Sequence, residues 1–574
     1  MELSNIDLII IFSFFIITLL IGVIVSKKAG KNSSEFFLSG RNMPWWLLGV
    51  SMVATTFAAD TPNLVAGIVR KDGIAGNWVW WAFLLTGMLT VFIYAKLWRK
   101  LGISTDLEFY EIRYKGKIAA FLRGFRALYL GVFFNVVIMA TVCLAGIKIG
   151  HVMLGLSAFE TLSIASVVTV LYSLLGGLKG VILTDFFQFI IAMVGSVWAA
   201  YYIIDLPEIG GLDGLLSNEA VQAKLNFLPK KTDNWDTWTA LIIVPLAVQW
   251  WSAWYPGAEP GGGGYIAQRM LAAKDEKHAT AATLFFNFAH YALRPWPWII
   301  IALASLVLFP EIADIKAQFP GLAEGFYKDD LAYPAMLSYL PAGLLGLVLA
   351  SLISAFMSTI STHLNWGSSY VVNDFYKRFI SPNASEKKLV NVGRFSTVIM
   401  MVLAALLSLV LEEAEEAFHL ILTIGAGTGL LFILRWFWKA INPYSEIIAM
   451  SVSFLVAAFF FIIDKGFEVE FSETFKMLWG VGITTVAWVG VTLFTQNEKY
   501  LNPEFNKRAF DNDNKFKNMG YKVLSIFLGC IAIYSALFSM GNYLLADKMQ
   551  ALYFLIAFII SAGLIASFWK KLFA

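Results

Sequence analysis

The stretch Ala54-Thr55-Thr56-Phe57-Ala58-Ala59-Asp60-Thr61-Pro62 interrupts an apolar segment that begins with Pro44-Trp45-Trp46. Pro62 cannot donate a backbone hydrogen bond to the carbonyl of Ala58, and Thr and Asp side chains compete for the backbone bonds of a helix. A broken helix is tolerated in a membrane only where its backbone is buried in protein or lines a cavity, and transporters use such breaks to bind ions. We therefore expect a broken membrane helix beside a polar site. The alternative is a proline kink with Asp60 near the outer surface.

The composition indicates a helical protein with many membrane spans. Of the 574 residues, 58% are hydrophobic and 14% are charged. The longest polar connections are roughly 25 to 30 residues, which leaves no room for a soluble catalytic domain. The five histidines show no metal-binding spacing and no Ser–His pairing, so an enzyme is not expected. Cys143 and Cys530 lie far apart in apolar segments and are expected to be packing residues.

Apolar runs of about 20 residues predict fifteen membrane helices. They cover residues 5–26, 44–69, 75–98, 121–150, 157–175, 179–204, 237–256, 279–308, 337–376, 389–411, 416–438, 443–464, 474–495, 521–544 and 550–570. We expect the whole chain, 1–574, to form one transmembrane domain.

Lysine and arginine collect in alternate loops, at 27–41, 96–126, 269–277, 377–394 and 499–522. The loops between them are acidic or mixed. Because basic loops stay on the cytoplasmic side, the N-terminus is expected outside and the C-terminus inside a cytoplasmic membrane.

A run of hydroxyl residues lies in another long apolar segment, at Ala355-Phe356-Met357-Ser358-Thr359, and continues with Ser361 and Thr362. On a helix, positions 355, 358, 359 and 362 share one face. Hydroxyl and backbone carbonyl oxygens are hard ligands that suit a cation such as sodium. The alternative is helix packing, because small and hydroxyl residues let membrane helices approach closely.

In chain order, these features resemble the sodium:solute symporter family, which includes bacterial proline, sialic acid and sugar cotransporters. The resemblance rests on Ser39-Gly40-Arg41 with Pro44-Trp45-Trp46, on Gly176-Gly177-Leu178-Lys179-Gly180 followed by Thr184-Asp185 and Gln188, on Gln268-Arg269, and on Ala355 to Thr359. It implies an all-α fold whose core, at 44–438, has five plus five helices in inverted repeats, similar to the leucine-transporter fold. One leading helix (5–26) precedes this core and about four accessory helices (443–574) follow it.

The same resemblance implies the function: a sodium-coupled symporter that imports a small organic solute by alternating access, with sodium as the coupling ion and the monomer as the working unit. It also implies the ion ligands. The common sodium site would consist of three backbone carbonyls and two hydroxyls, from Ala54, Phe57, Ala355, Ser358 and Thr359. A second sodium site, found in some members, corresponds to Asp185, Ser361 and Thr362. Alternatively, Asp185 pairs with Lys179 or a neighbouring arginine.

The solute is expected at the bilayer midplane beside the broken helix. Candidate contacts are Thr56, Asp60, Thr61, Trp80, Trp251, Tyr255 and Arg294. The chain departs from the sugar carriers, because Trp80 and Thr61 stand where a galactose-transporting member has glutamate and glutamine. Arg294 lies in an apolar helix and requires a partner, such as Asp60, other protein groups or a substrate carboxylate. An amino acid or sugar acid is therefore favoured over a neutral sugar.

Gly261-Gly262-Gly263-Gly264 lacks the Lys-Ser/Thr ending of a phosphate loop and is expected to be a flexible connection. A transport-derived sensor or a channel remains an alternative function, and a channel would equilibrate the solute without accumulating it.

Overall fold

The computed structural model describes residues 3–29, 31–252, 259–320, 324, 327–409, 424–425, 427–467, 471–495, 498–510, 517–545 and 547–573. Within these ranges the chain is helical, with two isolated β-bridges and no strand. Eleven helices are long and apolar enough to cross a membrane, and three shorter apolar helices, Trp45–Thr55, Ala158–Leu171 and Trp235–Ala247, accompany them. Residues 416–423 and 426 of the predicted helix at 416–438 lie outside the described residues, so the count of fifteen stays a prediction.

The longer elements, and the short ones that position the site, have the following bounds. They are α1 (Asn5–Ala29), α3 (Trp45–Thr55), α4 (Thr61–Asp72), η4 (Asp106–Glu108), α9 (Lys117–Leu128), α10 (Asn135–Leu154), α11 (Ala158–Ile204), α16 (Gly264–Ala272), α17 (Glu276–Phe288), η8 (Ala289–Leu293), α18 (Pro295–Leu308), α21 (Leu344–Tyr370), η11 (Val371–Ile380), α22 (Glu386–Ser408), α24 (Pro443–Phe467), α25 (Glu473–Thr495), η12 (Glu498–Tyr500), α27 (Met519–Leu545) and α28 (Lys548–Phe573).

The predicted helix break is present between α3, which ends at Thr55, and α4, which begins at Thr61. Pro62 lies in the first turn of α4, where its missing N–H would have had no helical partner. The Thr56 hydroxyl donates to the carbonyls of Met52 and Val53 at 3.1 and 2.9 Å, which is the competition for backbone bonds expected from the sequence. The break is buried in protein at Ala54 and Phe57.

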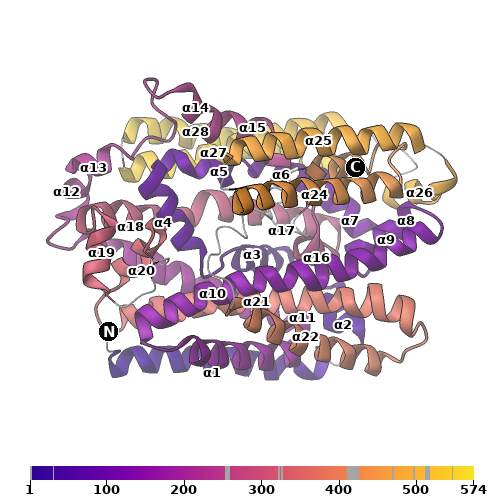
Figure 1. Ribbon diagram of the computed structural model, residues 1–574, viewed down its shortest axis with the longest axis horizontal. Helices are drawn as coiled ribbons and strands as arrows, with labels where there is room; N and C mark the ends of the chain where they lie inside the picture. Colours follow the sequence, from indigo (N-terminus) through magenta and orange to yellow (C-terminus); the bar gives the residue numbers. More distant parts are fainter. Residues whose placement is uncertain are drawn as a thin grey trace.

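The helix α21 lies at the centre of the packing, against α11, α1, α10 and α22 (Figure 1). In the same view α1 lies at one edge and the α27–α28 pair at the opposite edge. The predicted helices at 157–175 and 179–204 are continuous as α11, with a kink at Gly177. Gly177 has φ 51°, and a Cβ there would lie 2.7 Å from the carbonyl oxygen of Phe36, so this close approach requires glycine.

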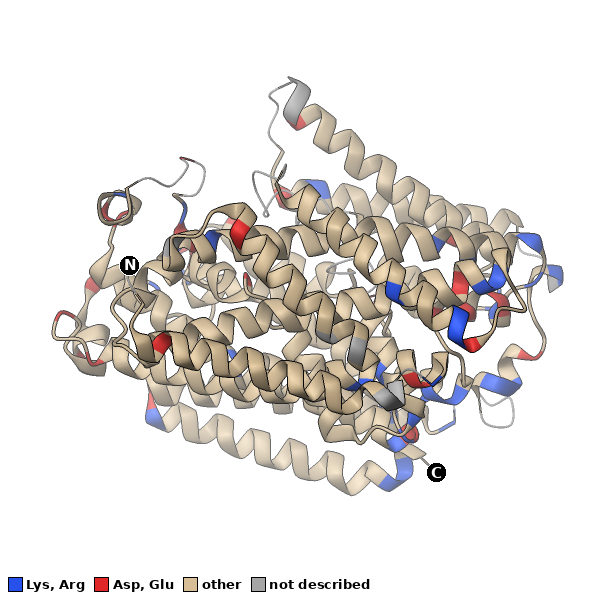
Figure 2. Cartoon of the chain, turned by 90° about the horizontal axis from the view of Figure 1, so that it is seen from below, with Lys and Arg blue, Asp and Glu red and all other residues tan. Residues whose placement is uncertain are grey.

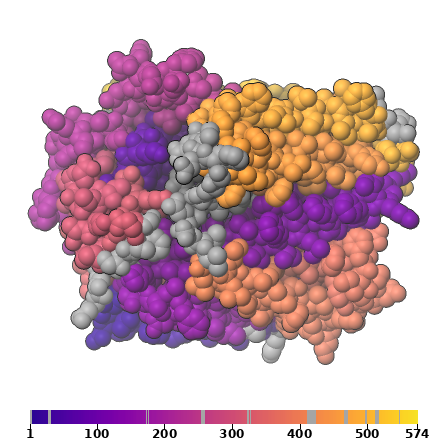
Figure 3. Space-filling view, in the orientation of Figure 1, coloured from indigo at the N-terminus to yellow at the C-terminus, as the bar shows by residue number. Residues whose placement is uncertain are grey.

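The outer helices present apolar side chains to their surroundings. Large exposed side chains such as Ile24, Leu406, Val486 and Phe494 lie on α1, α22 and α25. In water such surfaces would be unfavourable, whereas lipid solvates them. Lysines and arginines gather at one end of the molecule, where the C-terminus lies (Figure 2). The orange helices α24 and α25 lie beside the purple band formed by α9 and α10 (Figure 3).

The four-glycine run is not the flexible connection expected from its composition. Gly261, Gly262 and Gly264 have positive φ and are buried; the Gly261 carbonyl accepts from the Trp98 indole at 2.7 Å. The N–H of Gly264 donates to Asp106 Oδ2 at 3.0 Å, and the Tyr370 hydroxyl donates to Asp106 Oδ1 at 2.5 Å. Burial, and next the charge of nearby Glu259, raises the pKa of Asp106 to about 6. The run is therefore a fixed segment that ties α16 to the end of α21.

A buried carboxylate joins the first helix to α21. Asp7 Oδ1 accepts from the backbone N–H groups of Gly343 and Gly346, both at 2.7 Å, and Oδ2 accepts from the Ser4 hydroxyl at 2.5 Å. The N–H groups of a helix start have no partner within the helix, and a carboxylate also interacts favourably with the helix dipole there. Asp7 on α1 thus caps the N-terminal end of the neighbouring helix α21.

We predict that Asp7→Ala destabilises the protein, because two buried N–H groups of α21 lose a charged acceptor. Hydrogen bonds to charged groups contribute about 1.5 to 3 kcal/mol each, so the loss should be about 2 kcal/mol or more. Thermal unfolding of the purified protein in detergent measures it. Asp213→Ala, at an exposed aspartate, is the control. Equal midpoints for the two variants would contradict the capping role.

Candidate functional site

The hydroxyl face of α21 meets the last turn of α3 where that helix breaks. Thr359 Oγ1 donates to the backbone carbonyl of Thr55 at 3.0 Å, and the hydroxyls of Thr362 and Thr55 share a hydrogen bond of 3.0 Å. Ala355, Ser358 and Thr359 are all buried. The stripe predicted from helical periodicity therefore points at the break, and it brings several oxygen atoms into a small volume shielded from solvent.

Asp185 on α11 completes this oxygen cluster. Its Oδ1 accepts from the Ser358 hydroxyl at 2.7 Å and its Oδ2 accepts from the Ser51 hydroxyl at 2.5 Å. Asp185 has no exposed surface. Ser358 was predicted for the common sodium site and Asp185 for the second one. Because Ser358 bonds to Asp185, the two predicted sodium sites are contiguous.

Arg269 on α16 provides the positive charge opposite Asp185. The two side chains lie 3.6 Å apart, N to O, and both are fully buried. Arg269 also donates to the hydroxyls of Ser51 at 3.1 Å and Thr362 at 2.7 Å. A buried ion pair is tolerated where further hydrogen bonds satisfy its remaining polar atoms, and those to Ser51 and Thr362 are present. The pair joins four elements: α3, α11, α16 and α21.

A second buried arginine lies beside the break. Arg294, between η8 and α18, is 3% exposed. It donates to Thr56 Oγ1 at 3.2 Å and to the carbonyl of Val53 at 3.4 Å, and its guanidinium lies 5.5 Å from the centre of the Trp298 ring. No acidic side chain of the described residues pairs with Arg294, and its Nε has no hydrogen-bond partner among them. Its described partners are neutral protein groups, so of the alternatives considered from the sequence the pair with Asp60 does not form.

Histidine and aromatic side chains enclose Arg294. His290 Nδ1 lies 3.1 Å from Thr56 Oγ1, and His290 Nε2 lies 3.4 Å from a terminal nitrogen of Arg294. The Trp80 ring stacks on Tyr291 and meets the His290 ring edge-on, with centroid distances of 5.9 and 5.7 Å. This arrangement offers one cation, one imidazole and flat aromatic faces next to the oxygen cluster.

Comparison with known proteins places this geometry in context. The profile of the Sodium:solute symporter family matches residues 36–452, which include the broken helix, Asp185, Arg269, Arg294 and α21. The chain belongs to the sodium:solute symporter family. The sodium/glucose cotransporter of Vibrio parahaemolyticus is 28% identical over 479 residues, which cover 80% of this chain and 85% of that protein. The sodium/myo-inositol cotransporter of Homo sapiens is 27% identical over 498 residues, covering 79% and 67%.

Among solved structures, a sodium-coupled sialic acid symporter in a substrate-bound outward-open state matches with a TM-score of 0.70 and 22% identity, over 86% of this chain and 98% of that chain. This likeness confirms the all-α, leucine-transporter-like fold predicted from the sequence. Membership in the family confirms a multi-pass membrane transporter that couples a small-molecule solute to sodium, and it confirms that the chain is not an enzyme.

The structure does not bring every predicted site residue of this symporter together. Ser361 donates to the carbonyl of Ser358 on its own helix at 3.1 Å, and no described contact joins it to Asp185. Asp60 and Thr61 lie partly exposed at the start of α4. Trp251 packs edge-on against Trp250, with centroids 5.4 Å apart. Tyr255 lies outside the described residues.

Four residues of the site were not among the predicted ligands: Ser51, Thr55, Arg269 and His290. Arg269 carries a signal only through the Gln268-Arg269 motif, because its place in the basic stretch 269–277 indicates a cytoplasmic loop rather than a buried site. Ser51 and Thr55 carry a weaker signal, since they precede the break on an apolar helix. His290 carries a signal only through its spacing of four residues from Arg294, which places both on one helical face.

We predict that Arg269→Met destabilises the symporter by about 3 to 5 kcal/mol, because Asp185 is left as a buried unpaired charge. In the double variant Asp185→Asn with Arg269→Met, part of this loss should return, since no uncompensated charge remains. A double-mutant cycle of thermal unfolding midpoints measures the coupling. Strictly additive effects of the two substitutions would show that the pair carries no interaction energy.

Proposed function

We propose that this symporter imports a small organic solute that carries a carboxylate, such as an amino acid or a sugar acid, together with sodium. The observation that supports it is Arg294, a buried guanidinium whose described partners are all neutral. A buried charge is costly without a counter-charge, and a solute carboxylate could accept two parallel hydrogen bonds from a guanidinium. A neutral sugar is the second candidate, since the relatives include transporters named for glucose and myo-inositol.

The proposed sodium site uses the carbonyls of Ala54, Phe57 and Ala355 and the hydroxyls of Ser358 and Thr359. The Thr359 hydroxyl donates a hydrogen bond of 3.0 Å to the carbonyl of Thr55, at the end of α3. A cation bound between α3 and α21 would replace this hydrogen bond with ion–oxygen contacts. Asp185 and Thr362, with Ser361, are the proposed second sodium site. There, Arg269 supplies the counter-charge to Asp185 when no ion is bound, which gives the site a stable empty state.

Solute and ion would be coupled through the short broken segment. Arg294 donates to the carbonyl of Val53 and to Thr56, and these residues flank Ala54 of the proposed sodium site. A solute that draws the guanidinium away would free the Val53 carbonyl and shift the same backbone that holds the ion. Each sodium entering down a membrane potential of 100 mV contributes about 2.3 kcal/mol, so a second ion would increase accumulation strongly.

The proposed organisation is a single transmembrane domain. One domain comprises the leading helix, a ten-helix inverted-repeat core at 44–438 and accessory helices at 443–574, and the monomer is the working unit. The N-terminus lies outside and the C-terminus inside the cytoplasmic membrane, because the basic side chains gather at the end where the C-terminus lies (Figure 2).

Uptake into proteoliposomes tests the proposed solute. A panel of labelled amino acids, sugar acids and neutral sugars is supplied under an inward sodium gradient or under potassium of equal ionic strength. We expect one carboxylate compound to accumulate above its external concentration only with the sodium gradient. Equilibration without accumulation would indicate a channel, and accumulation confined to neutral sugars would refute the carboxylate assignment.

For the ion site, we predict that Thr359→Ala raises the sodium concentration that half-saturates uptake, because one ligand oxygen is lost. The increase should be roughly tenfold, corresponding to about 1.4 kcal/mol of lost binding free energy. Ser369→Ala is the matched control. Ser369 is a buried serine on the same helix, and its hydroxyl donates to the backbone carbonyl of Trp366 one turn earlier. An unchanged half-saturation in Thr359→Ala would remove it from the site.

For the solute site, we predict that Arg294→Gln lowers the affinity for the carboxylate solute by at least roughly tenfold, since a charged hydrogen bond contributes about 1.5 to 3 kcal/mol. Sodium binding in the absence of solute should change less than solute binding, because Arg294 donates to the carbonyl of Val53 and not to a proposed sodium ligand. Solute-dependent protection against thermal unfolding measures the first effect, and sodium-dependent protection measures the second. If Arg294→Gln binds the solute as the wild type does, Arg294 has a purely structural role.

A further inference from the structure

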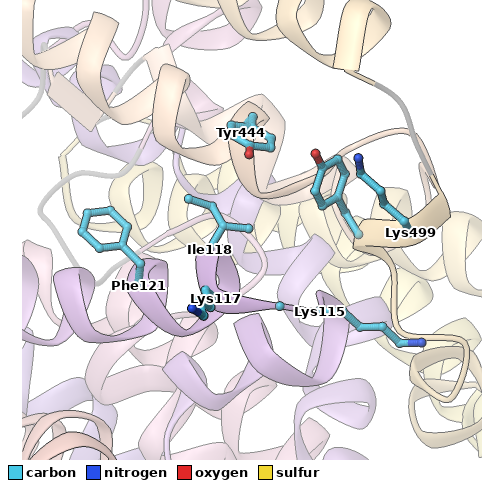
Figure 4. Close-up of a pocket in the computed structure, with 8 residues that line it drawn as sticks. Lys115, Lys117, Ile118, Phe121, Tyr444 and Lys499 are labelled. Carbon is cyan, nitrogen blue, oxygen red and sulfur yellow. The ribbon is translucent and has the colours of Figure 1, made fainter.

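A pocket of about 610 Å³ lies away from the sodium and solute sites, where the core meets the accessory helices (Figure 4). Three segments line it: the start of α9, the start of α24 and the short helix η12. The lining residues are Lys115, Gly116, Lys117, Ile118, Phe121, Tyr444, Lys499 and Tyr500. Ile118 lies between Tyr444 and Lys117, with Phe121 on one side and Lys499 on the other.

The walls of the pocket are held together by backbone pairing. Tyr114 and Leu501 form an antiparallel bridge, and the N–H of Lys115 donates to the carbonyl of Tyr500 at 2.8 Å. Tyr444 packs edge-on against Tyr500 with a centroid distance of 5.4 Å. The Tyr114 hydroxyl donates to Glu446 on α24 at 2.8 Å. The pocket is therefore built into the joint between the core and the accessory helices.

The chemistry of the lining favours an anion. Three of the eight lining residues are lysines, two are tyrosines with hydroxyl donors, and none is acidic. Within the described ranges, Lys115 and Lys117 are exposed and form no ion pair. An ammonium group binds a phosphate as a point charge, and a phenol adds a hydrogen bond.

An apolar track leads away from this basic pocket along α9. Phe121, Phe125 and Leu128 are spaced by four and three residues, so they share one face of the helix. Their side chains are 56%, 41% and 41% exposed, and Phe121 also lines the pocket. The helical segment Lys117–His151 is one of the candidate membrane spans, so in a bilayer this exposed apolar face would be available to acyl chains.

We propose that this pocket binds the phosphate headgroup of an anionic phospholipid, with its acyl chains along Phe121, Phe125 and Leu128. A soluble phosphate would use the lysines alone, whereas a lipid uses both the charge and the track. Basic pockets between membrane helices on the cytoplasmic side recognise anionic headgroups in this way. The bound lipid would bridge the core and the accessory helices. Only the choice of the cytoplasmic leaflet rests on the proposed orientation, and binding itself can be tested without it.

The test is lipid retention by the purified full-length protein, measured by native mass spectrometry with phosphatidylglycerol, phosphatidylcholine or glycerol 3-phosphate. We expect phosphatidylglycerol to bind more tightly than the other two. The double variant Lys115→Gln with Lys117→Gln should lose at least roughly fivefold in affinity, since each basic residue near an anionic surface adds to the attraction. Lys115→Arg with Lys117→Arg should keep the binding, which separates lost charge from misfolding.

The matched control is Lys230→Gln with Lys231→Gln, an exposed lysine pair in the connection before residue 235, which should leave the binding unchanged. Equal retention of phosphatidylglycerol and phosphatidylcholine would overturn the proposal. So would equal phosphatidylglycerol binding by the wild type and the Lys115/Lys117 glutamine variant. If glycerol 3-phosphate binds as tightly as phosphatidylglycerol, the pocket is a soluble-phosphate site and the lipid assignment fails.

Discussion

The buried pair of Asp185 and Arg269 is the constraint on which the rest of the site depends. Neither side chain has exposed surface, so each charge is stable only because of the other and of the hydroxyls of Ser51, Ser358 and Thr362 around them. These five residues come from α3, α11, α16 and α21. The pair therefore fixes the hydroxyl face of α21 against the broken end of α3, where the ion ligands of this family are expected.

The local features of the fold could be predicted from the sequence, because they depend on neighbouring residues. Pro62 and the preceding threonines are enough to predict the break, and helical periodicity is enough to predict the hydroxyl stripe on α21. Which residue faces that stripe could not be predicted in the same way: Ser358 and Asp185 are 173 positions apart. The resemblance to the family supplied Asp185, while Arg269 appeared in it only as part of a motif without a role.

Two other expectations show where tertiary packing overrides composition. The glycines at 261–264 suggest a flexible loop, yet Gly261 and Gly262, both at positive φ, pack closely against Tyr94 and Trp98. Asp60 was one of the partners considered for Arg294, together with other protein groups and a substrate carboxylate, and Arg294 bonds Thr56, Val53 and His290. Both outcomes depend on contacts between residues that are distant in the sequence. A single sequence does not reveal which segments become neighbours in the fold.

The central claim is that the oxygen cluster between the break and α21 binds sodium, and direct binding of radioactive sodium to the purified protein tests it most directly. We predict saturable sodium binding that potassium does not displace. The double variant Ser358→Ala with Thr359→Ala should lose binding at the site that contains these two hydroxyls, whereas Ser369→Ala should keep it. Bound sodium of the same affinity and amount in the double variant and the wild type would contradict the account.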